Sequence, residues 1–363
     1  MLKSISRAVP VAILVAAFGS TALTTGQTQT GAPAANKAGA VGLTGTGSFT
    51  SFVENMDRSL AFYHDAFGME VPALPASGER PYNQANPGLF KFFDIEGAKE
   101  RHQSARIPGT RVSVELMEIQ QVPHQTIALR IQDPGNATLV FIVRDVDAAL
   151  ARATQANATI ATPGGKPVSF LREDGAQDGA RSILVRDIDG RFIELRQLAS
   201  PPAGTTDILD MRLSLTVNDM DATTKLYYNV LGFNPTKYSQ DAAAMRSLTG
   251  LPKAEVRKRR VQAPGSQLWI ELVEFKGVDR TPLRMKIQDR GAARLQLRVK
   301  DTDAIVAVMK AAGLKVMSTD GAVQPIPPNF KAALVADPNN FFLTPFAPCD
   351  GCAPGIGVPA RTN

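Results

Sequence analysis

The chain has 363 residues, of which 44% are hydrophobic and 20% charged, so it can bury two cores of ordinary size and is not a disordered protein. Its net charge of +6 comes in part from the basic segment KAEVRKRR at 253–260. Such a segment can bind phosphate, but it contains no aromatic residue on which a base could stack. We therefore expect a solvated strand face and no nucleic-acid partner.

The N-terminal residues combine a basic head, MLKSISR, with an apolar run, AVPVAILVAAFG. The run of about twelve residues is too short to cross a bilayer, and small residues follow it. We predict a signal peptide over residues 1–22, a secreted or periplasmic location in a bacterium, and no stable membrane insertion after cleavage; an uncleaved anchor is the alternative. Residues 23–45 are rich in Gly, Ala, Thr and Gln and are expected to form a flexible leader.

The segment SFVENMDRSLAFYHDAFGMEV at 51–71 runs a short β-prone stretch into an amphipathic helix. Asn55 or Asp57 can cap this helix, and its apolar residues recur at the spacing of one helix face. Short β-rich runs separated by turn residues follow. The same order of strand, Asp-containing turn and helix is predicted at 138–160 and at 294–316.

The chain repeats itself at a nearly fixed interval. RIPGTRVSVELMEI at 106–119 matches QAPGSQLWIELVEF at 262–275 with an offset of 156 residues. Upstream the offset is 164, since Val53 corresponds to Val217. The chain is therefore a tandem duplication whose halves differ by about eight residues in one loop.

Each half divides again into two modules of βαβββ type, near 46–121, 135–199, 208–277 and 291–347. A single module exposes an apolar sheet face and cannot stand alone, so modules must pair. The predicted fold is therefore α+β, with four tandem βαβββ modules that form two eight-stranded cupped sheets around cavities. The predicted domains are 46–199 and 208–347, joined by a hinge at 199–207.

The tail at 348–363 is rich in Pro and Gly and contains the only two cysteines of the sequence, Cys349 and Cys352 in PCDGCAPG. A local disulfide in an oxidising compartment fits this context. The CxxC spacing also allows metal binding or redox chemistry, although no His lies nearby.

Three segments carry a family resemblance: NMDRSLAFYHDAFGMEV at 55–71, VRDIDGRFIELRQL at 185–198 and NDMDATTKLYYNVLGFNP at 218–235. They resemble the vicinal oxygen chelate superfamily, which includes glyoxalase I, extradiol dioxygenases, methylmalonyl-CoA epimerase and the fosfomycin and bleomycin resistance proteins. The resemblance covers residues 46–347 and implies a glyoxalase-like fold, on which isomerases, lyases, dioxygenases, transferases and binding proteins all occur. It also implies a divalent metal in the cup of a module pair, bound by a His of a first strand and a Glu of a last strand.

The metal positions that the resemblance implies contain no histidine in this sequence. Counting five residues back from the valine of each turn gives the first-strand positions Ser48, Thr138, Arg212 and Arg294. The last-strand positions read Glu115, Glu194, Glu271 and, in the fourth module, Thr344. We predict these eight residues as ligand-binding residues, with no metal and no other cofactor, because a transition metal would need nitrogen or sulfur donors.

The chemistry of each cup depends on which modules pair. If modules one and two share a cup, it holds Ser48, Thr138, Glu115 and Glu194, either as a polar pocket with hydrogen-bonded carboxylates or as an oxygen site for a hard cation. If modules three and four share the other cup, it holds Arg212, Arg294, Glu271 and Thr344. Two guanidinium groups repel a divalent cation, so that cup either binds a carboxylate or phosphate or is filled by a cluster of Arg and Glu.

None of the three histidines is expected to act in catalysis. His64 lies mid-helix, His102 lies in the polar run KERHQSAR, and His124 lies in a loop. Each lacks an orienting partner that the sequence reveals, so we expect solvated or structural roles.

Three functional hypotheses follow. The first is a secreted, metal-independent protein that binds a small anionic or oxygen-rich molecule, as a monomer with pseudo-dimeric halves or as a homodimer. The second is a glyoxalase-type lyase or a dioxygenase-type oxidoreductase that uses Glu115 and Glu194, either with a divalent metal or with one carboxylate as general base. The third is an interaction scaffold, which would show a large exposed apolar patch.

Overall fold

The structure, a computed structural model, describes residues 42–82, 87–171, 177–204, 206–239, 242–326 and 329–349. The predicted signal peptide, nearly all of the predicted leader, and Cys352 lie outside the described residues. Cys349 is disulfide-bonded, while its pairing with Cys352 stays a prediction. Within these ranges no helix has the length and apolar character needed to cross a membrane.

The first module begins with a strand, a capping turn and a helix, as predicted. Strand β1 (Leu43–Phe52) leads into α2 (Met56–Phe67), where the side chain of Asn55 accepts a hydrogen bond from the backbone N–H of Arg58 at 3.0 Å. The helix ends because Gly68 takes a left-handed conformation with φ of 63°, which a residue without a side chain adopts at little steric cost. Strand β1 starts three residues before the predicted boundary at residue 46.

Three further helices start in the same way. They are α4 (Val146–Gln155), α5 (Met220–Leu231) and α7 (Thr302–Ala311), capped by Asp145, Asp219 and Asp301 respectively. Each aspartate accepts hydrogen bonds from backbone N–H groups of the first turn, which have no partner inside the helix. The predicted Asp-containing caps are confirmed.

The remaining elements complete the four modules. Module one adds α3 (Pro87–Phe93), β2 (Lys99–Arg106) and β3 (Ser113–Gln120). Module two adds to α4 the strands β4 (Ala137–Val143), β5 (Thr159–Ile160), β6 (Val168–Leu171), β7 (Gln177–Arg186) and β8 (Phe192–Gln197). Module three adds to α5 the elements β9 (Ile208–Thr216), β10 (Asn234–Ser239), α6 (Ala242–Thr249), β11 (Glu255–Gln262) and β12 (Trp269–Lys276). Module four adds to α7 the strands β13 (Ala293–Val299), β14 (Lys315–Val316), β15 (Gln324–Ile326), β16 (Phe330–Ala332), β17 (Val335–Ala336) and β18 (Phe342–Pro348).

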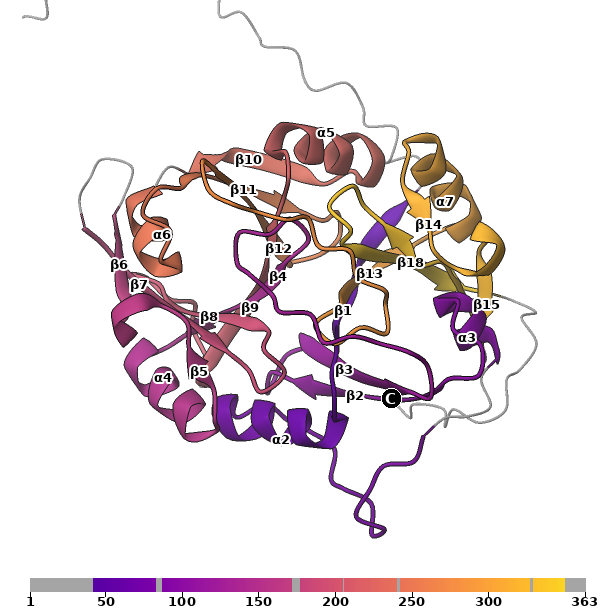
Figure 1. The fold of residues 1–363 in the computed structure, drawn as a ribbon, viewed down its shortest axis with the longest axis horizontal. Helices are drawn as coiled ribbons and strands as arrows, with labels where there is room; N and C mark the ends of the chain where they lie inside the picture. The colour runs from indigo at the N-terminus through magenta and orange to yellow at the C-terminus, as the bar shows by residue number, and fades with distance from the viewer. Residues whose placement is uncertain are drawn as a thin grey trace, which may run out of the picture. The chain divides into compact units, whose positions relative to one another are not determined.

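The strands of the described residues form two nine-stranded sheets, in which module one pairs with module four and module two with module three. The terminal sheet, from modules one and four, is joined where β1 runs antiparallel to β13. The central sheet, from modules two and three, is joined where β4 runs antiparallel to β9. Figure 1 shows β1 between β3 and β13, although β1 and β13 lie at opposite ends of the sequence.

This pairing differs from the two cups considered from sequence, which joined module one to two and module three to four. Each predicted domain instead contributes one module to each sheet, and short strands such as β5 and β14 raise the strand number from eight to nine. In an isolated module, the first strand would have one unpaired edge, and these strands are similar in all four modules. The repeat pattern alone is therefore compatible with either pairing of modules.

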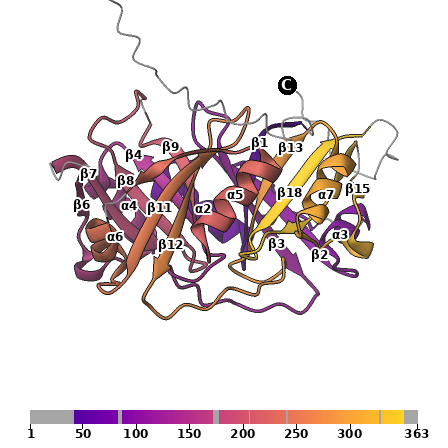
Figure 2. The same cartoon turned by 90° about the horizontal axis from the view of Figure 1, so that it is seen from above.

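Each sheet has a helix face and a cup face. On the helix face, α2, α4, α5 and α7 bury their apolar residues in a core to which both sheets contribute. On the cup face of the terminal sheet, α3 packs Phe92 and Phe93 against strand residues, and on that of the central sheet α6 does the same with Met245 and Leu248. Figure 2 shows α3 near β2 and β15, and α6 near β6. A short helix therefore covers part of each cup face.

A buried arginine joins the two sheets. Arg191, in the hairpin before β8, is 1% exposed and its Nε donates to Oγ of Ser51 in β1 at 2.7 Å. Its Nη1 donates to the carbonyl of Ala137, and its Nη2 donates to the carbonyls of Gly291 and Ala292. The guanidinium thus satisfies backbone groups of modules two and four where strands of both sheets meet.

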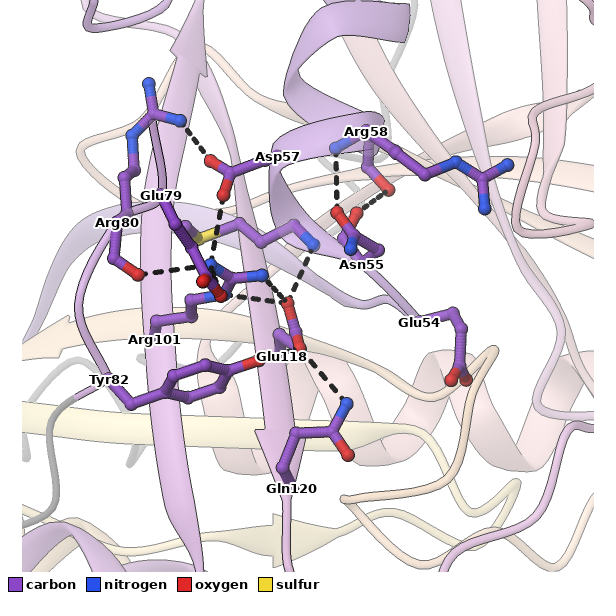
Figure 3. Close-up of polar contacts among 12 residues, drawn as sticks. Glu54, Asn55, Asp57, Arg58, Glu79, Arg80, Tyr82, Arg101, Glu118 and Gln120 are labelled. Carbon is purple, nitrogen blue, oxygen red and sulfur yellow. Dashed lines mark hydrogen bonds and ion pairs between the residues drawn. The ribbon is translucent and has the colours of Figure 1, made fainter. Parts of the chain in front are cut away.

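An ion-pair cluster on the helix face occurs twice, once in each half. In module one, Arg101 of β2 bonds Glu118 of β3 at 2.8 Å and Asp57 of α2 at 3.0 Å (Figure 3). In module three, Arg257 bonds Glu274 at 3.3 Å and Asp221 at 3.1 Å. The repetition indicates that this cluster anchors a helix to its sheet in both halves.

The difference in length between the halves lies in module one, in the loop between α2 and α3. This loop adds Glu79, Arg80 and Tyr82 to the cluster around Arg101 and Glu118 (Figure 3). The Tyr82 hydroxyl donates to Glu118, and the guanidinium of Arg101 lies over the Tyr82 ring at 4.5 Å. These three residues therefore cover the cluster and fasten this part of the loop to the sheet.

Candidate functional site

The eight predicted site residues fall into two new groups of four, because the modules pair differently. The terminal sheet carries Ser48, Glu115, Arg294 and Thr344. The central sheet carries Thr138, Glu194, Arg212 and Glu271. The predicted two-arginine clamp for an anion is therefore wrong, since Arg212 and Arg294 belong to different sheets, and so is a site that combines Glu115 with Glu194.

The strand register determines which residues lie beside the carboxylates. They differ from the first-strand positions obtained by counting back from the valine of each turn. Thr50 lies opposite Glu115, Val140 opposite Glu194, and Ser214 opposite Glu271. Each of these neighbours lies two residues after the first-strand position assigned from the turn. A shift of two residues keeps a side chain on the same face of a strand. The carboxylates thus have no histidine beside them at either position.

In the central sheet, one guanidinium group binds both carboxylates. Arg196 donates from Nε and Nη2 to Glu194 at 2.7 and 2.9 Å, and from Nη1 and Nη2 to Glu271 at 2.7 and 2.9 Å. Lys258 of β11 adds its ammonium group 2.5 Å from Oε2 of Glu271. All four side chains are nearly buried, with exposed fractions between 1% and 12%. The alternative of a cluster of Arg and Glu is thus realised, around an arginine that was not predicted.

Arg196 and Lys258 were missed for identifiable reasons. Arg196 lies two residues after Glu194 in FIELRQ, so strand alternation would have placed it on the same face. Lys258 belongs to the basic segment at 253–260, which was expected to be a solvated face. That expectation is wrong for Lys258, because it lies on the cup face and is paired with Glu271.

The electrostatics of the cluster favour the charged form of both acids. Burial by itself raises the pKa of Glu271, but Arg196 and Lys258 hold it well below its usual range. For Glu194, burial acts in the same direction and Arg196 again outweighs it, so the pKa of Glu194 is lowered. Burial and the charge of Arg196 lower the pKa of Lys258. The group is therefore held together as an ion-pair network at neutral pH.

These donors do not fit a divalent metal. Three guanidinium nitrogens and one ammonium group already bind Glu194 and Glu271, and a metal ion would have to displace them. In the terminal sheet, only one of the two last-strand positions holds a carboxylate, Glu115, and it is bound by Arg294. Across the ranges that the structure describes, no group of three or more His, Cys, Asp or Glu residues could hold a metal ion.

The central cup has little free space. Between its strands and α6 lies a cavity bordered by Thr138, Glu194 and Ser214 on the polar side and by Met245 and Leu248 on the apolar side. Its accessible volume is about 10 Å³, which is room for about one water molecule. A metabolite does not fit there unless α6 moves.

The terminal cup is built differently around Glu115, the carboxylate of its last-strand position. Oε2 of Glu115 accepts hydrogen bonds from Thr50 at 2.6 Å, Arg294 at 3.0 Å and Gln296 at 3.2 Å. The guanidinium of Arg294 lies 5.1 Å from the ring centre of Phe93, so α3 shields the ion pair. Burial alone raises the pKa of Glu115, but Arg294 and its hydrogen bonds lower it below the usual value.

Polar groups continue along the cup face of the terminal sheet. Oγ of Ser48 lies 3.2 Å from Oγ of Ser113, and the backbone N–H of Ser48 donates to Gln296 at 3.4 Å. Thr344 lies beside Gln296 in the register and is 3% exposed, yet its hydroxyl has no hydrogen-bond partner among the described residues. A buried hydroxyl without a partner costs free energy unless a ligand or water satisfies it.

A histidine and a glutamate that were not predicted as site residues lie on the same face. Nδ1 of His102 lies 2.8 Å from Oε2 of Glu100, two residues away on the edge strand β2. Glu100 is fully buried, and the second oxygen of its carboxylate has no partner within the described part of the chain. The ring of His102 is 43% exposed. The i, i+2 spacing in KERHQSAR is the signal that would have found this pair.

The pKa of His102 is raised above its ordinary value. Partial burial of the ring disfavours the charged form, but the hydrogen bond with Glu100 and the negative charges of Glu115 and Glu100 outweigh it. His102 and Glu115 are diagonal neighbours on β2 and β3, because Ser104, two residues after His102, lies opposite Glu115. The side chains of such neighbours are about 7 Å apart. The terminal cup therefore combines an ionised carboxylate with an imidazole that is protonated more readily than usual.

Known structures share the arrangement of the modules. Glyoxalase I from Zea mays is similar with a TM-score of 0.53 and 17% sequence identity, over 84% of this chain and 92% of that chain. A mutant of the same maize enzyme is similar with a TM-score of 0.54 and 17% identity, over 85% and 96% of the two chains. A putative dioxygenase from Bacillus subtilis has a TM-score of 0.49 and 14% identity, over 86% of each chain. At this identity, the likeness to the maize enzyme shows the fold alone.

No curated protein matches the sequence. The family model of the Glyoxalase/Bleomycin resistance protein/Dioxygenase superfamily matches residues 45–195 and 211–338, which together make up more than half of the chain. These two matches follow the tandem repeat seen in the sequence. The chain therefore belongs to the glyoxalase, bleomycin resistance protein and dioxygenase superfamily, as the resemblance to vicinal oxygen chelate proteins implied.

Proposed function

We propose that this protein binds a small, oxygen-rich molecule on the cup face of the terminal sheet without a metal ion. The observation that carries the proposal is the hydroxyl of Thr344, which is buried beside Gln296 and has no partner among the described residues. Proteins rarely bury a hydroxyl without a hydrogen bond, so a ligand that bonds to Thr344 would satisfy it. Oγ of Ser182 on the central cup face has no partner among the described residues either, but there Arg196 and Lys258 already occupy the carboxylates.

The surrounding groups suggest what the ligand looks like. Among the described residues, the hydrogen bonds to Glu115 all end on Oε2, which leaves Oε1 to accept one from a ligand hydroxyl. The serine hydroxyls, the Gln296 amide and the His102 ring supply further donors. Phe346 and Phe330 lie 6.1 Å apart at one side of the same sheet, and the Phe330 ring offers apolar contact because the residue is 40% exposed. A hydroxylated or carboxylated molecule with an apolar part fits this set.

Secretion remains part of the proposal through the signal peptide expected at residues 1–22, which lies outside the described residues. A secreted or periplasmic binder would meet its ligand outside the cytoplasm. The scaffold hypothesis has less support, because the large apolar side chains that are exposed in the described ranges, Leu74, Ile160 and Phe330, come from three separate segments.

The test is a thermal-shift screen of hydroxylated and carboxylated small molecules with EDTA present throughout. A ligand of the terminal cup raises the melting temperature of the wild type, and the rise shrinks in Thr344→Val and in Gln296→Leu. Thr138→Val serves as the matched control, since it changes a threonine on the central sheet. The proposal fails if a ligand found in the screen stabilises both terminal-cup variants as much as the wild type, or if none is found without added metal.

A second candidate function is metal-free acid–base catalysis at the same place, and the Glu100 and His102 pair favours it. Environments that raise the pKa of His102 and lower that of Glu115 separate the roles of proton donor and ionised carboxylate. Glu194 takes no part, because it belongs to the central sheet. In this case His102→Gln keeps ligand binding but abolishes conversion of the bound ligand, measured by NMR of the ligand over time; unchanged conversion would exclude His102.

A further inference from the structure

The carboxylates of the central cup converge on one atom of the protein itself. Nη2 of Arg196 lies 2.9 Å from Oε2 of Glu194 and 2.9 Å from Oε2 of Glu271. The Nε edge of the guanidinium serves Glu194 and the Nη1 edge serves Glu271, each at 2.7 Å. The two carboxylates therefore face each other across a planar cation, as two acidic ligands face each other across a metal ion.

The charges in closest contact balance. Glu194 and Glu271 contribute two negative charges, and Arg196 with Lys258 contributes two positive charges. Arg212 and Arg260 lie further away, each 3.9 Å from Oε1 of Glu271, and Arg212 also faces Asp210 at 3.5 Å. A divalent cation carries the same charge as Arg196 and Lys258 together. Two carboxylates in a nearly buried position need such compensation, because an uncompensated buried charge is strongly unfavourable.

We infer that Arg196 and Lys258 replace a divalent cation in the central cup, and that Glu194 and Glu271 form a latent metal site which these side chains occupy. The central sheet then needs no metal to fold, and its cup is a structural centre rather than a binding site. This inference is independent of the function proposed for the terminal cup.

The chemistry of the latent site follows from its oxygen atoms. Thr138 and Ser214 lie beside the carboxylates and border the same small cavity as Glu194, so two hydroxyl groups and a water molecule can complete the shell. Oxygen ligands without histidine suit a hard cation such as Mn²⁺, Mg²⁺ or Ca²⁺. The metal that the variants below acquire is therefore of this class.

The inference is tested with the double variant Arg196→Ala, Lys258→Ala in the full chain, with Mn²⁺ as the probe. We expect the melting temperature of the wild type to be the same in EDTA and in millimolar Mn²⁺. The double variant melts well below the wild type in EDTA and regains about 5 °C in Mn²⁺, with one ion bound per chain by elemental analysis. The matched control Arg294→Ala uncovers a single carboxylate in the terminal cup and gains no stability from Mn²⁺.

A third variant covers the case in which the double variant does not fold in EDTA. Arg196→Met and Lys258→Met combined with Glu194→Gln and Glu271→Gln remove all four of these charges, and we expect this neutral variant to fold and to ignore Mn²⁺. The double variant is then refolded with and without Mn²⁺. Two results overturn the inference: a wild type that binds one Mn²⁺ and loses it on Glu271→Gln, or a double variant that gains neither stability nor folding from Mn²⁺ while the neutral variant folds.

Discussion

In the central sheet, Glu194 and Glu271 each receive two hydrogen bonds from Arg196, and Lys258 completes the balance of charge. In the terminal sheet, the equivalent last-strand positions hold Glu115 and Thr344. There Arg294, Thr50 and Gln296 share one carboxylate oxygen, and the hydroxyl of Thr344 has no partner among the described residues. Two copies of one architecture have thus diverged in how their last-strand carboxylates are paired, although Oγ of Ser182 and Nε of Arg212 in the central cup also have no hydrogen-bond partner among the described residues.

This difference distinguishes polar groups that bond to one another and hold the fold together from polar groups that are left for a ligand. In the central cup, Arg196 and Lys258 occupy both carboxylates, so these acids have little left to offer a ligand. On the terminal cup face, the described residues leave a buried hydroxyl, one oxygen of Glu115 and a half-exposed imidazole with hydrogen-bonding capacity that a ligand can use.

The largest expected effect follows from removing the central cation. Arg196→Ala leaves two nearly buried carboxylates without their main partner, and we expect a loss of about 3–5 kcal/mol in the free energy of unfolding. Arg294→Ala in the terminal cup costs about 1–3 kcal/mol, because Glu115 keeps hydrogen bonds from Thr50 and Gln296. Urea unfolding of both variants measures the difference. Equal losses would show that the two cups do not differ as described.

A second comparison concerns pH, through one buried aspartate in the hairpin before β8 and one in the hairpin before β18. Asp187 in the central sheet accepts from Tyr63 as Asp337 in the terminal sheet accepts from Tyr227. Burial, with the nearby charge of Asp189, raises the pKa of Asp187 to about 6. A raised pKa means that the folded state binds the proton more tightly, so this contribution to stability is fully present below about pH 4 and is lost as the pH rises through 6.

Asp187→Asn should therefore remove up to about 3 kcal/mol of pH-dependent stability between pH 4 and pH 7 relative to the wild type. Asp337→Asn is the matched control. The pKa of Asp337 is also raised by burial, but Asn339 donates a hydrogen bond to it where the other copy has the charge of Asp189, so its effect is smaller. Chemical denaturation at several pH values measures both. If the two variants show the same pH dependence, the charge of Asp189 has no influence.

The sequence predicts the modules of this protein well, because each depends on local signals. These signals act within about one turn of a helix. They are the caps at Asn55 and Asp145, the αL glycine at Gly68 and the 3.6-residue spacing of buried side chains. The pairing of modules depends on contacts such as Thr50 with Arg294, which are 244 residues apart. Four similar first strands offer similar edges, so local patterns did not select the partner.

The sequence predicted the carboxylates of the candidate site but not the basic residues that surround them. Glu115, Glu194 and Glu271 were found because their motif repeats along the chain. Arg196 was not predicted because the family resemblance implies only the Glu of each last strand as a metal ligand. Arg196 lies two residues after Glu194 on the same face of β8. His102 was missed because its partner Glu100 makes sense only once β2 is known to be an edge strand with both side chains on the cup face.

A smaller effect is expected from the imidazole of the terminal cup. Glu100→Gln replaces a buried carboxylate with a neutral amide that stabilises the protonated ring less, so the pKa of His102 should fall. The ring resonances of His102 in an NMR pH titration measure this shift. Ser104→Ala, two residues further on the same strand face, is the control and should leave the pKa of His102 unchanged. No shift in Glu100→Gln would remove the support for acid–base chemistry at this position.

The smallest expected effect tests the unused hydroxyl directly, without any ligand. Thr344→Val replaces a buried, unpartnered hydroxyl by a methyl group of similar size, so we expect the free energy of unfolding to rise by about 0.5–1 kcal/mol. Thr50→Val in the same cup should lower it by about 1–2 kcal/mol, because it removes a donor to Glu115. Urea unfolding resolves the opposite signs. A loss in Thr344→Val as large as in Thr50→Val would mean that the hydroxyl is already satisfied in the free protein, and the proposal of a ligand at Thr344 would then lose its support.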